Sequence, residues 1–363
     1  VAVRRTQMKV LQRTPVVNAR ANTRAKSFRF GLGKPPPAPP REFDKKFAAA
    51  SVLLSSAGLI DLLAPGVVLD LLSPSAIVGP DFLYTSLVRL NGSFAPLAAV
   101  SAGLIAEAST SDRIESKTYS RLALGLGVYQ LAAVAACGVA VIERAASPEL
   151  LALQAAVGIP TMWASASFLR RSGSNFIDEL RSVSVDVQEG CDVRAKSTAA
   201  GRFFSGNLII SLVVGGSFAF SPYSPLAIPA IFVGETEPAA GALLRVIFGT
   251  SALCALCPVL FILQDSAERG AGFLDARSTR LLAIFAGLAT LLVDAGTIGS
   301  ILDSLEYLRA SNAVPGLEDV DTTQIPNLIS ALLIAGVLGV YFISVGVRGE
   351  EAEEQLVPPR ESL

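Results

Sequence analysis

The sequence predicts an all-α, polytopic membrane protein with about eight transmembrane helices in two parallel four-helix repeats. Three observations lead to this fold class. Half of the residues are hydrophobic (51%) and only 17% are charged, whereas about a quarter are charged in a soluble domain. Eight apolar segments each approach the ~20 residues that are needed to cross a bilayer. Finally, a stretch around the second segment resembles one around the sixth.

The N-terminal residues 1–46 form a basic arm that precedes the first apolar segment. They hold twelve Lys and Arg against Glu42 and Asp44, a composition typical of organelle transit sequences. The proline-rich residues 34–40 predict an extended polyproline II spacer. Two interpretations stay open: a residual transit segment, or a mature arm that binds a partner or an anionic lipid surface. The basic residues available for binding are Arg4, Arg5, Lys9, Arg13, Arg20, Arg24, Lys26, Arg29 and Lys34.

The apolar segments divide the rest of the chain into two membrane units. We expect spans at about 47–72, 83–106, 119–142, 149–169, 203–221, 241–264, 280–302 and 324–347. Pro65 and Gly66 predict a break near the end of the first span. The first four spans form the unit 47–169 and the last four the unit 203–347. A polar loop, 170–202, separates the units, and an acidic tail, 348–363, ends the chain.

The distribution of charge predicts the orientation in the membrane. With eight spans, both termini and every second loop lie on one side. All 30 Lys and Arg lie on that side except Arg144 and Arg309 in the opposite loops and Arg89 and Arg245 within spans. Such a bias follows the positive-inside rule. The opposite loops are acidic through Glu235, Glu237, Glu318, Asp319 and Asp321.

An internal duplication is the second large-scale feature of the sequence. Asp81–Arg113 aligns without a gap on Glu237–Arg269, with Arg89 opposite Arg245 and identity at six positions. The first spans also run parallel from Phe47 and Phe203, where Gly58 meets Gly215 and Pro65 meets Pro222 after a one-residue shift. Units with an even number of spans would be parallel repeats. The alternative is that apolar segments resemble one another through composition alone.

Four charged residues inside the predicted spans are candidate site residues: Arg89, Arg245, Asp61 and Asp294. A charge at bilayer depth costs at least ~2.5–3.5 kcal/mol on insertion scales, so it normally faces a partner or a cavity. The arginines could snorkel to the interface, form structural ion pairs, or bind an anionic ligand or headgroup. Asp294 with Arg245 is the predicted pair.

Intramembrane amides and cysteines form two further groups. The amides either hydrogen-bond between helices or ligate chlorophyll magnesium through their side-chain oxygens, so the cofactor stays unknown, with chlorophyll, carotenoid or bound lipid as candidates. Cys254 and Cys257 have CxxC spacing, but they lie in an apolar run without further ligands, which favours packing. The amides are Asn91, Gln130, Gln154, Asn207 and Gln264.

The residues that are missing exclude several kinds of chemistry. The chain has no histidine, which removes the usual proton shuttle, the commonest metal ligand and the His-based catalytic triads. It also lacks a P-loop, a Rossmann glycine pattern and paired catalytic carboxylates in a plausible pocket. We therefore expect no metal site and no enzyme activity. The arm lacks the interleaved aromatic residues of a nucleic-acid binder, so no nucleic-acid partner is expected.

These observations favour a non-enzymatic accessory or assembly subunit of a large organellar membrane complex. Its composition resembles that of a nucleus-encoded plastid membrane protein, which suggests a photosynthetic complex of the thylakoid with both termini on the stromal side. Its partners would be membrane lipids and other subunits. The alternative function is a small-solute or ion carrier built on the duplicated bundle, with Arg89, Arg245 and Asp294 near its midline.

Overall fold

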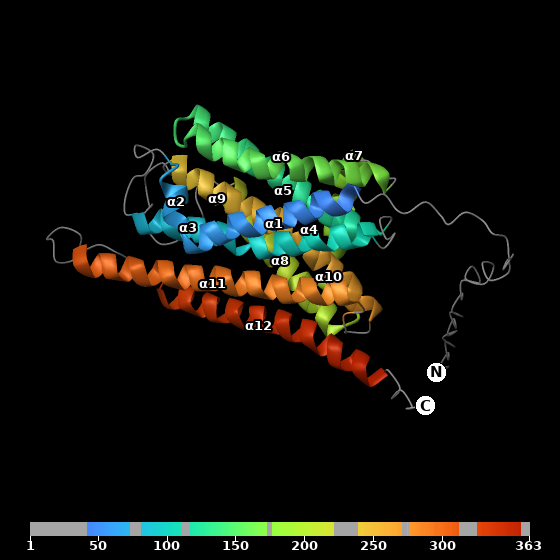
Figure 1. The fold of residues 1–363 in the computed structure, drawn as a ribbon. Helices are drawn as coiled ribbons and strands as arrows, with labels where there is room; N and C mark the ends of the chain where they lie inside the picture. The colour runs from blue at the N-terminus through green and yellow to red at the C-terminus, as the bar shows by residue number, and fades with distance from the viewer. Residues whose placement is uncertain are drawn as a thin grey trace, which may run out of the picture. The chain divides into compact units, whose positions relative to one another are not determined.

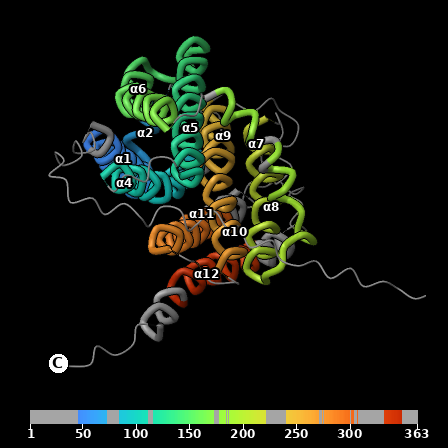
Figure 2. The backbone as a smooth tube through the Cα atoms, turned by 90° about the vertical axis from the view of Figure 1, so that its right-hand side faces the viewer, coloured from blue at the N-terminus to red at the C-terminus, as the bar shows by residue number. Residues whose placement is uncertain are grey.

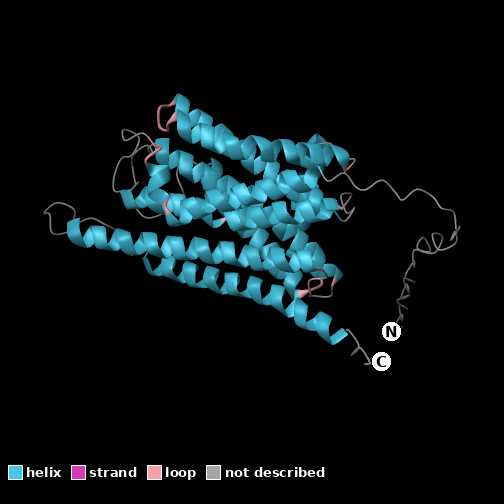
Figure 3. Cartoon of the chain, in the orientation of Figure 1, coloured by secondary structure: helices cyan, strands magenta, loops and turns pink. Residues whose placement is uncertain are grey.

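The computed structural model describes residues 42–72, 81–110, 116–172, 176–220, 239–270, 274, 276–311 and 325–356. The regular elements in these ranges are helices (Figures 1 and 3). Their one β contact is an isolated bridge between Leu72 and Ala146. Most of the predicted basic arm, including all nine of its candidate binding residues, lies outside the described residues.

The first half of the bundle begins with a broken helix. Pro65 occupies the first turn of a short helix, where its missing N–H is not needed, and Ala64 leaves helical geometry with φ −133°. This confirms the break that the sequence predicts near Pro65 and Gly66. The helices of this half are α1 (Glu42–Leu63), α2 (Pro65–Leu69), α3 (Asp81–Ser93), α4 (Ala95–Thr110), α5 (Lys117–Ile142) and α6 (Pro148–Arg171).

The second half follows a polar segment and also consists of helices. The polar segment between the halves contains α7, an amphipathic helix whose Val187 and Cys191 pack against the core. The elements from there on are α7 (Phe176–Cys191), η2 (Val193–Ala195), α8 (Ala199–Phe220), α9 (Ala239–Ser251), the π-helical turn η4 (Ala252–Leu256), α10 (Cys257–Arg269), α11 (Arg277–Ser311) and α12 (Ile325–Leu356).

Seven helical stretches of the described chain are long and apolar enough to cross a membrane. The predicted eighth span, 324–347, falls within α12, whose described apolar part is the shorter stretch Leu332–Arg348. The membrane character of the chain is therefore supported, while the count of eight stays a prediction. The seven stretches are Lys45–Leu63, Tyr84–Thr110, Lys117–Ile142, Pro148–Arg171, Ala199–Phe220, Ala240–Arg269 and Arg277–Asp303.

Two of these stretches lie at the centre of the bundle. The apolar windows of Tyr84–Thr110 and Ala240–Arg269 are 78% and 72% buried, against 22–39% for the other five. Around them, α1 packs on α3 and α4, while α8 packs on α9, η4 and α10. The outer hairpins α5–α6 and α11–α12 complete the arrangement, with α5 beside α9 (Figure 2) and α11 beside α3.

Both central stretches change geometry part-way along. A turn at Phe94 separates α3 from α4, and the π-helical turn η4 separates α9 from α10, which has Pro258 in its first turn. A proline removes one backbone hydrogen bond from the preceding turn, and π-turns occur mostly as single insertions within α-helices. The two interruptions therefore lie at comparable places in the second helix of each half.

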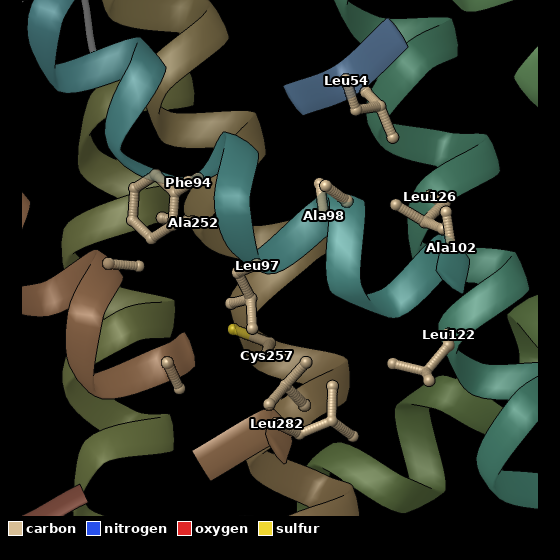
Figure 4. Packing of buried hydrophobic residues seen from close by; sticks show 14 of the residues in the cluster. Leu54, Phe94, Leu97, Ala98, Ala102, Leu122, Leu126, Ala252, Cys257 and Leu282 are labelled. Carbon is tan, nitrogen blue, oxygen red and sulfur yellow. The ribbon is translucent and has the colours of Figure 1, made fainter. Parts of the chain in front are cut away.

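Apolar side chains fill the space between the two central stretches. Phe94 and Phe248 have ring centroids 5.6 Å apart, and Phe218 packs on Phe248 at 4.9 Å. Below them, Leu97 of α4 and Leu282 of α11 are buried on either side of Cys257 (Figure 4). Since these side chains are close-packed, the interface between the halves forms one continuous hydrophobic core.

Candidate functional site

Arg245 is buried in α9, with 6% of its surface exposed. Its Nη1 donates a hydrogen bond of 2.6 Å to the carbonyl oxygen of Phe218, in the last turn of α8. The last four carbonyls of a helix have no partner within the helix, and they carry the negative end of its dipole. The guanidinium therefore caps α8. This role could not be predicted from the sequence, because it depends on the packing of α9 against the end of α8.

Arg89 has a different environment from Arg245. Its side chain is exposed on α3, whereas Val88 beside it is buried. An exposed arginine near the beginning of a span can extend its charged group to the interface while its aliphatic part covers the helix. The two arginines therefore differ in environment, since one is buried and the other is exposed.

Asp61 lies in the last turn of α1, half-buried against α3. A methyl group placed on Gly92 would come within 2.8 Å of the Asp61 Cβ, so only glycine fits there. Asp61 lies three residues before Ala64, where α1 ends. The ion pairs between described side chains do not include Asp61 with Arg245.

Asp294 lies in the interior of α11, with 6% of its surface exposed. Its Oδ2 has no hydrogen-bond partner and lies 3.6 Å from where a Cβ on Gly336 of α12 would be. The ion pairs between described side chains are Arg121–Asp265 and Arg181–Asp178. The predicted pairing of Asp294 with Arg245 is thus not among them.

Most of the candidate amides bond to protein groups. Gln154 Nε2 donates to Gln130 Oε1 at 3.1 Å, which joins α6 to α5. Gln264 Nε2 donates to the Gly190 carbonyl at 3.1 Å and to Ser205 Oγ, and Asn207 Nδ2 donates to the Phe203 carbonyl of its own helix at 2.9 Å.

Asn91 of α3 differs from the other amides. It is buried, with 6% of its surface exposed, and its Oδ1 has no hydrogen-bond partner. An uncompensated buried carbonyl oxygen costs roughly 1–3 kcal/mol. Of the five predicted amides, Asn91 is therefore the one whose buried side-chain oxygen has no partner among the described residues.

All four cysteines are free thiols. Cys254 lies in η4 and the buried Cys257 begins α10, so the CxxC pair spans a π-turn rather than the exposed start of a redox helix. Cys191, which the sequence places in a polar loop, ends α7, and burial raises the pKa of its thiol. Within the described ranges, no group of three or more Cys, Asp and Glu could hold a metal ion.

Two polar clusters on the predicted positive side were missed by the sequence analysis. Glu268, near the end of α10, accepts four hydrogen bonds of 2.6–3.0 Å from the N–H and hydroxyl groups of Ser197 and Thr198. Thr198 Oγ1 in turn accepts from Gly201 N at 2.9 Å and caps α8. A Ser-Thr pair before an apolar run was the available signal for the cap, but nothing local identified Glu268 as its partner.

The other missed cluster joins the two halves. Arg121 Nη1 of α5 bonds to Asp265 Oδ2 of α10 at 2.6 Å, with the guanidinium 6.0 Å from the centre of the Phe261 ring. Both partners lie near the ends of their spans, where charged groups are tolerated. This contact aligns the two halves at one membrane surface.

These features define a class: an all-helical protein with seven described helices that are long and apolar enough to cross a membrane, and with polar residues that mostly hold helices together. No protein family and no curated protein sequence matches this chain. The class rests, therefore, on the chemistry and packing of the chain itself.

Proposed function

We propose that the protein is a non-enzymatic accessory or assembly subunit of a large organellar membrane complex. The observation that carries the proposal is the different environment of the two intramembrane arginines. Arg245 caps α8, whereas Arg89 is exposed on α3, and aromatic packing fills the interface between the halves. A carrier would instead need polar groups that converge on a central cavity.

The outer helices supply the surface that lipids and neighbouring subunits would contact. Seven apolar helices suggest membrane embedding, and large apolar side chains face outward from several of them. The backbone hydrogen bonds of these helices are made within each helix, so their outer surface can be covered by lipid or by another helix. Examples are Val52, Leu63, Ile142, Trp163, Val213 and Val337.

The same proposal includes eight spans in two parallel repeats, with α12 as the eighth. Comparable contacts in the two halves support it. A methyl group on Gly92 would lie 2.9 Å from the Gly58 carbonyl oxygen, and one on Gly249 would lie 2.7 Å from that of Gly215. In the same way, Phe47 of α1 packs on Phe168 of α6, and Phe204 of α8 on Phe342 of α12.

In the central stretches, these contacts favour an alignment of the two halves that is shifted by one residue from the gap-free alignment. Gly92 corresponds to Gly249, which aligns Arg89 with Val246 and Val88 with Arg245. The burial of the residues agrees with this register, because Val88 and Arg245 are both buried while Arg89 and Val246 are not.

The arm deletion tests the subunit proposal. Removal of residues 1–40 should release the protein from its complex on a native gel of solubilised membranes, because many weak contacts of a basic chain add up over a large surface. The bundle should stay folded, since its helices satisfy their own backbones. A matched control replaces the nine basic residues of the arm with glutamine and keeps the length. Comigration unchanged by both variants would contradict the arm as an anchor.

We propose the thylakoid, with both termini on the stromal side, as the location of this complex. Comigration with a pigmented complex would support this placement, and comigration with a colourless respiratory complex would move the protein to mitochondria. Protease treatment of sealed vesicles tests the orientation. The arm, the 170–202 segment and the C-terminal tail should be cut from the same side, and cleavage of the 303–323 segment from that side would rule out eight spans.

One observation favours the carrier as a second candidate. The central stretches are interrupted at Phe94 and at η4, and paired interruptions in corresponding helices often mark substrate sites in transporters. Flux measurements on proteoliposomes containing Arg245→Met distinguish the two functions. A carrier would lose flux at normal abundance, while a subunit would lose folding or assembly because the α8 cap is removed.

A further inference from the structure

The α11–α12 seam, defined here as Gly287, Leu291 and Asp294 on α11 with Gly336 and Gly339 on α12, contains one acid. The two helices approach closely, because a methyl group on Gly287 would lie 2.6 Å from the Gly339 carbonyl oxygen. Asp294 follows on the same stripe, two turns further along. At 1.5 Å per residue it lies about 26 Å from the start of α11, well inside the span.

Asp294 is buried in this seam without a compensating group. Only 6% of its surface is exposed, and Oδ2 accepts no hydrogen bond. Within the described part of the chain, no ion pair includes Asp294. An isolated carboxylate in a medium of low dielectric constant costs so much free energy that the group binds a proton instead.

Among the described residues, the elements that pack on α11 place no ion-pair partner against Asp294. On α12, the stretch Leu332–Val347 holds no charged residue, and Tyr341 is its only titratable group; the Tyr341 ring packs on Phe203 of α8. On α3, Arg89 is exposed. The charged residues of α4 and α10 lie close to the opposite ends of those helices: Glu107, Asp265, Glu268 and Arg269.

We propose that Asp294 is an intramembrane proton-binding site located in the α11–α12 seam. The carboxylate takes up one proton from water to give the neutral acid, and release of the proton restores the carboxylate. The ionised form needs water or a cation beside it, and the closed seam shields Oδ2 from both. Proton release is therefore linked to opening of the seam, and opening in turn favours release, because coupling between two equilibria is reciprocal. This proposal does not depend on the subunit or carrier function.

Carbodiimides of different solubility test the site in the full chain reconstituted in lipid vesicles. A protonated carboxyl gives its proton to a carbodiimide nitrogen while its oxygen adds to the central carbon, and the adduct rearranges to a stable N-acylurea. Dicyclohexylcarbodiimide, which dissolves in lipid, should label Asp294 about tenfold more than a water-soluble carbodiimide does, because the acid is neutral and shielded from water. Peptide mass spectrometry locates the adduct.

Two controls make the result specific. Asp303, nine residues further along α11, is exposed and should show the opposite preference. The Asp294→Asn variant should lose the dicyclohexylcarbodiimide adduct at position 294. It should keep the unfolding temperature of the unchanged protein, because one neutral group replaces another. Equal labelling of Asp294 and Asp303 by the water-soluble reagent, or absence of the lipid-soluble adduct from Asp294, would overturn the proposal. So would severe unfolding of Asp294→Asn, which would indicate that the ionised form is required.

Discussion

The hairpins α5–α6 and α11–α12 hold their buried polar groups in opposite ways. In α5–α6, Gln130 and Gln154 bond to each other across the two helices. In α11–α12, the seam has glycines and Asp294, whose Oδ2 has no partner. An amide pair satisfies itself without a change of charge, whereas an unpaired acid can gain or lose a proton. If Asp294 binds a proton as proposed, the second hairpin can respond to its surroundings, whereas the amide pair of the first hairpin does not change its charge.

Steric crowding between α11 and α12, which forces the two helices apart, gives the largest expected effect on stability. Gly287→Leu would place a side chain where a methyl group already lies 2.6 Å from the Gly339 carbonyl oxygen, so the helices must separate. We expect a loss of about 3 kcal/mol or more in the free energy of unfolding, at the upper end of overpacking effects. Unfolding in mixed micelles measures it.

Gly138→Leu is the matched control for that change, because a Cβ on Gly138 of α5 meets nothing within 4 Å. It should change stability little. If the two variants were equally stable, α11 and α12 would not be packed through glycine, and the seam as defined here would be wrong.

Separation of the amide pair should cost less. Gln130→Leu removes the acceptor of the Gln154 amide, and interhelical hydrogen bonds in membranes average about 0.6 kcal/mol, with a maximum of about 1.7 kcal/mol. A double-mutant cycle with Gln154→Leu isolates the coupling free energy. A coupling of zero would mean that the first hairpin, too, holds unpaired amides, and the contrast between the hairpins would disappear.

The contact that ties the first hairpin to the second half should contribute still less. Arg121→Gln removes the ion pair with Asp265, whose side chain is about half exposed. Such exposed pairs typically contribute about 0.2–1 kcal/mol to the free energy of unfolding. The difference from the unchanged protein should shrink as salt rises from low to physiological concentration. A salt-independent loss would instead assign the role of Arg121 to its packing on Phe261.

The smallest expected effect belongs to Asp294→Asn. If the acid is neutral in the seam, the amide has nearly the same volume and adds no charge, so the free energy of unfolding should change by less than about 0.5 kcal/mol. Asp294→Leu provides a second measurement, and it should be neutral or stabilising because it removes an unsatisfied polar atom. Strong destabilisation by both variants would show that Asp294 makes an essential polar contact.

Much of the architecture could be predicted from the sequence, because the constraint acts locally along the chain. A span must be long and apolar to cross the bilayer, and Pro65 interrupts a helix wherever it stands. Helix class, the positions of seven apolar helices and the break in the first span therefore follow from composition and order. The roles of the candidate site residues were harder to predict, since a charged residue within an apolar run does not reveal which groups its side chain contacts.

Packing between distant segments decided the roles of those charges. Arg89 and Arg245 align in sequence, yet one faces outward and the other caps α8, because a one-residue difference in register rotates a helix face by about 100°. Asp294 and Arg245 are both deep in spans, but they lie on different helices with different neighbours. The sequence by itself determined how many charges enter the membrane, and the tertiary structure decided which of them are satisfied, because hydrogen-bond partners come from segments far apart in the chain.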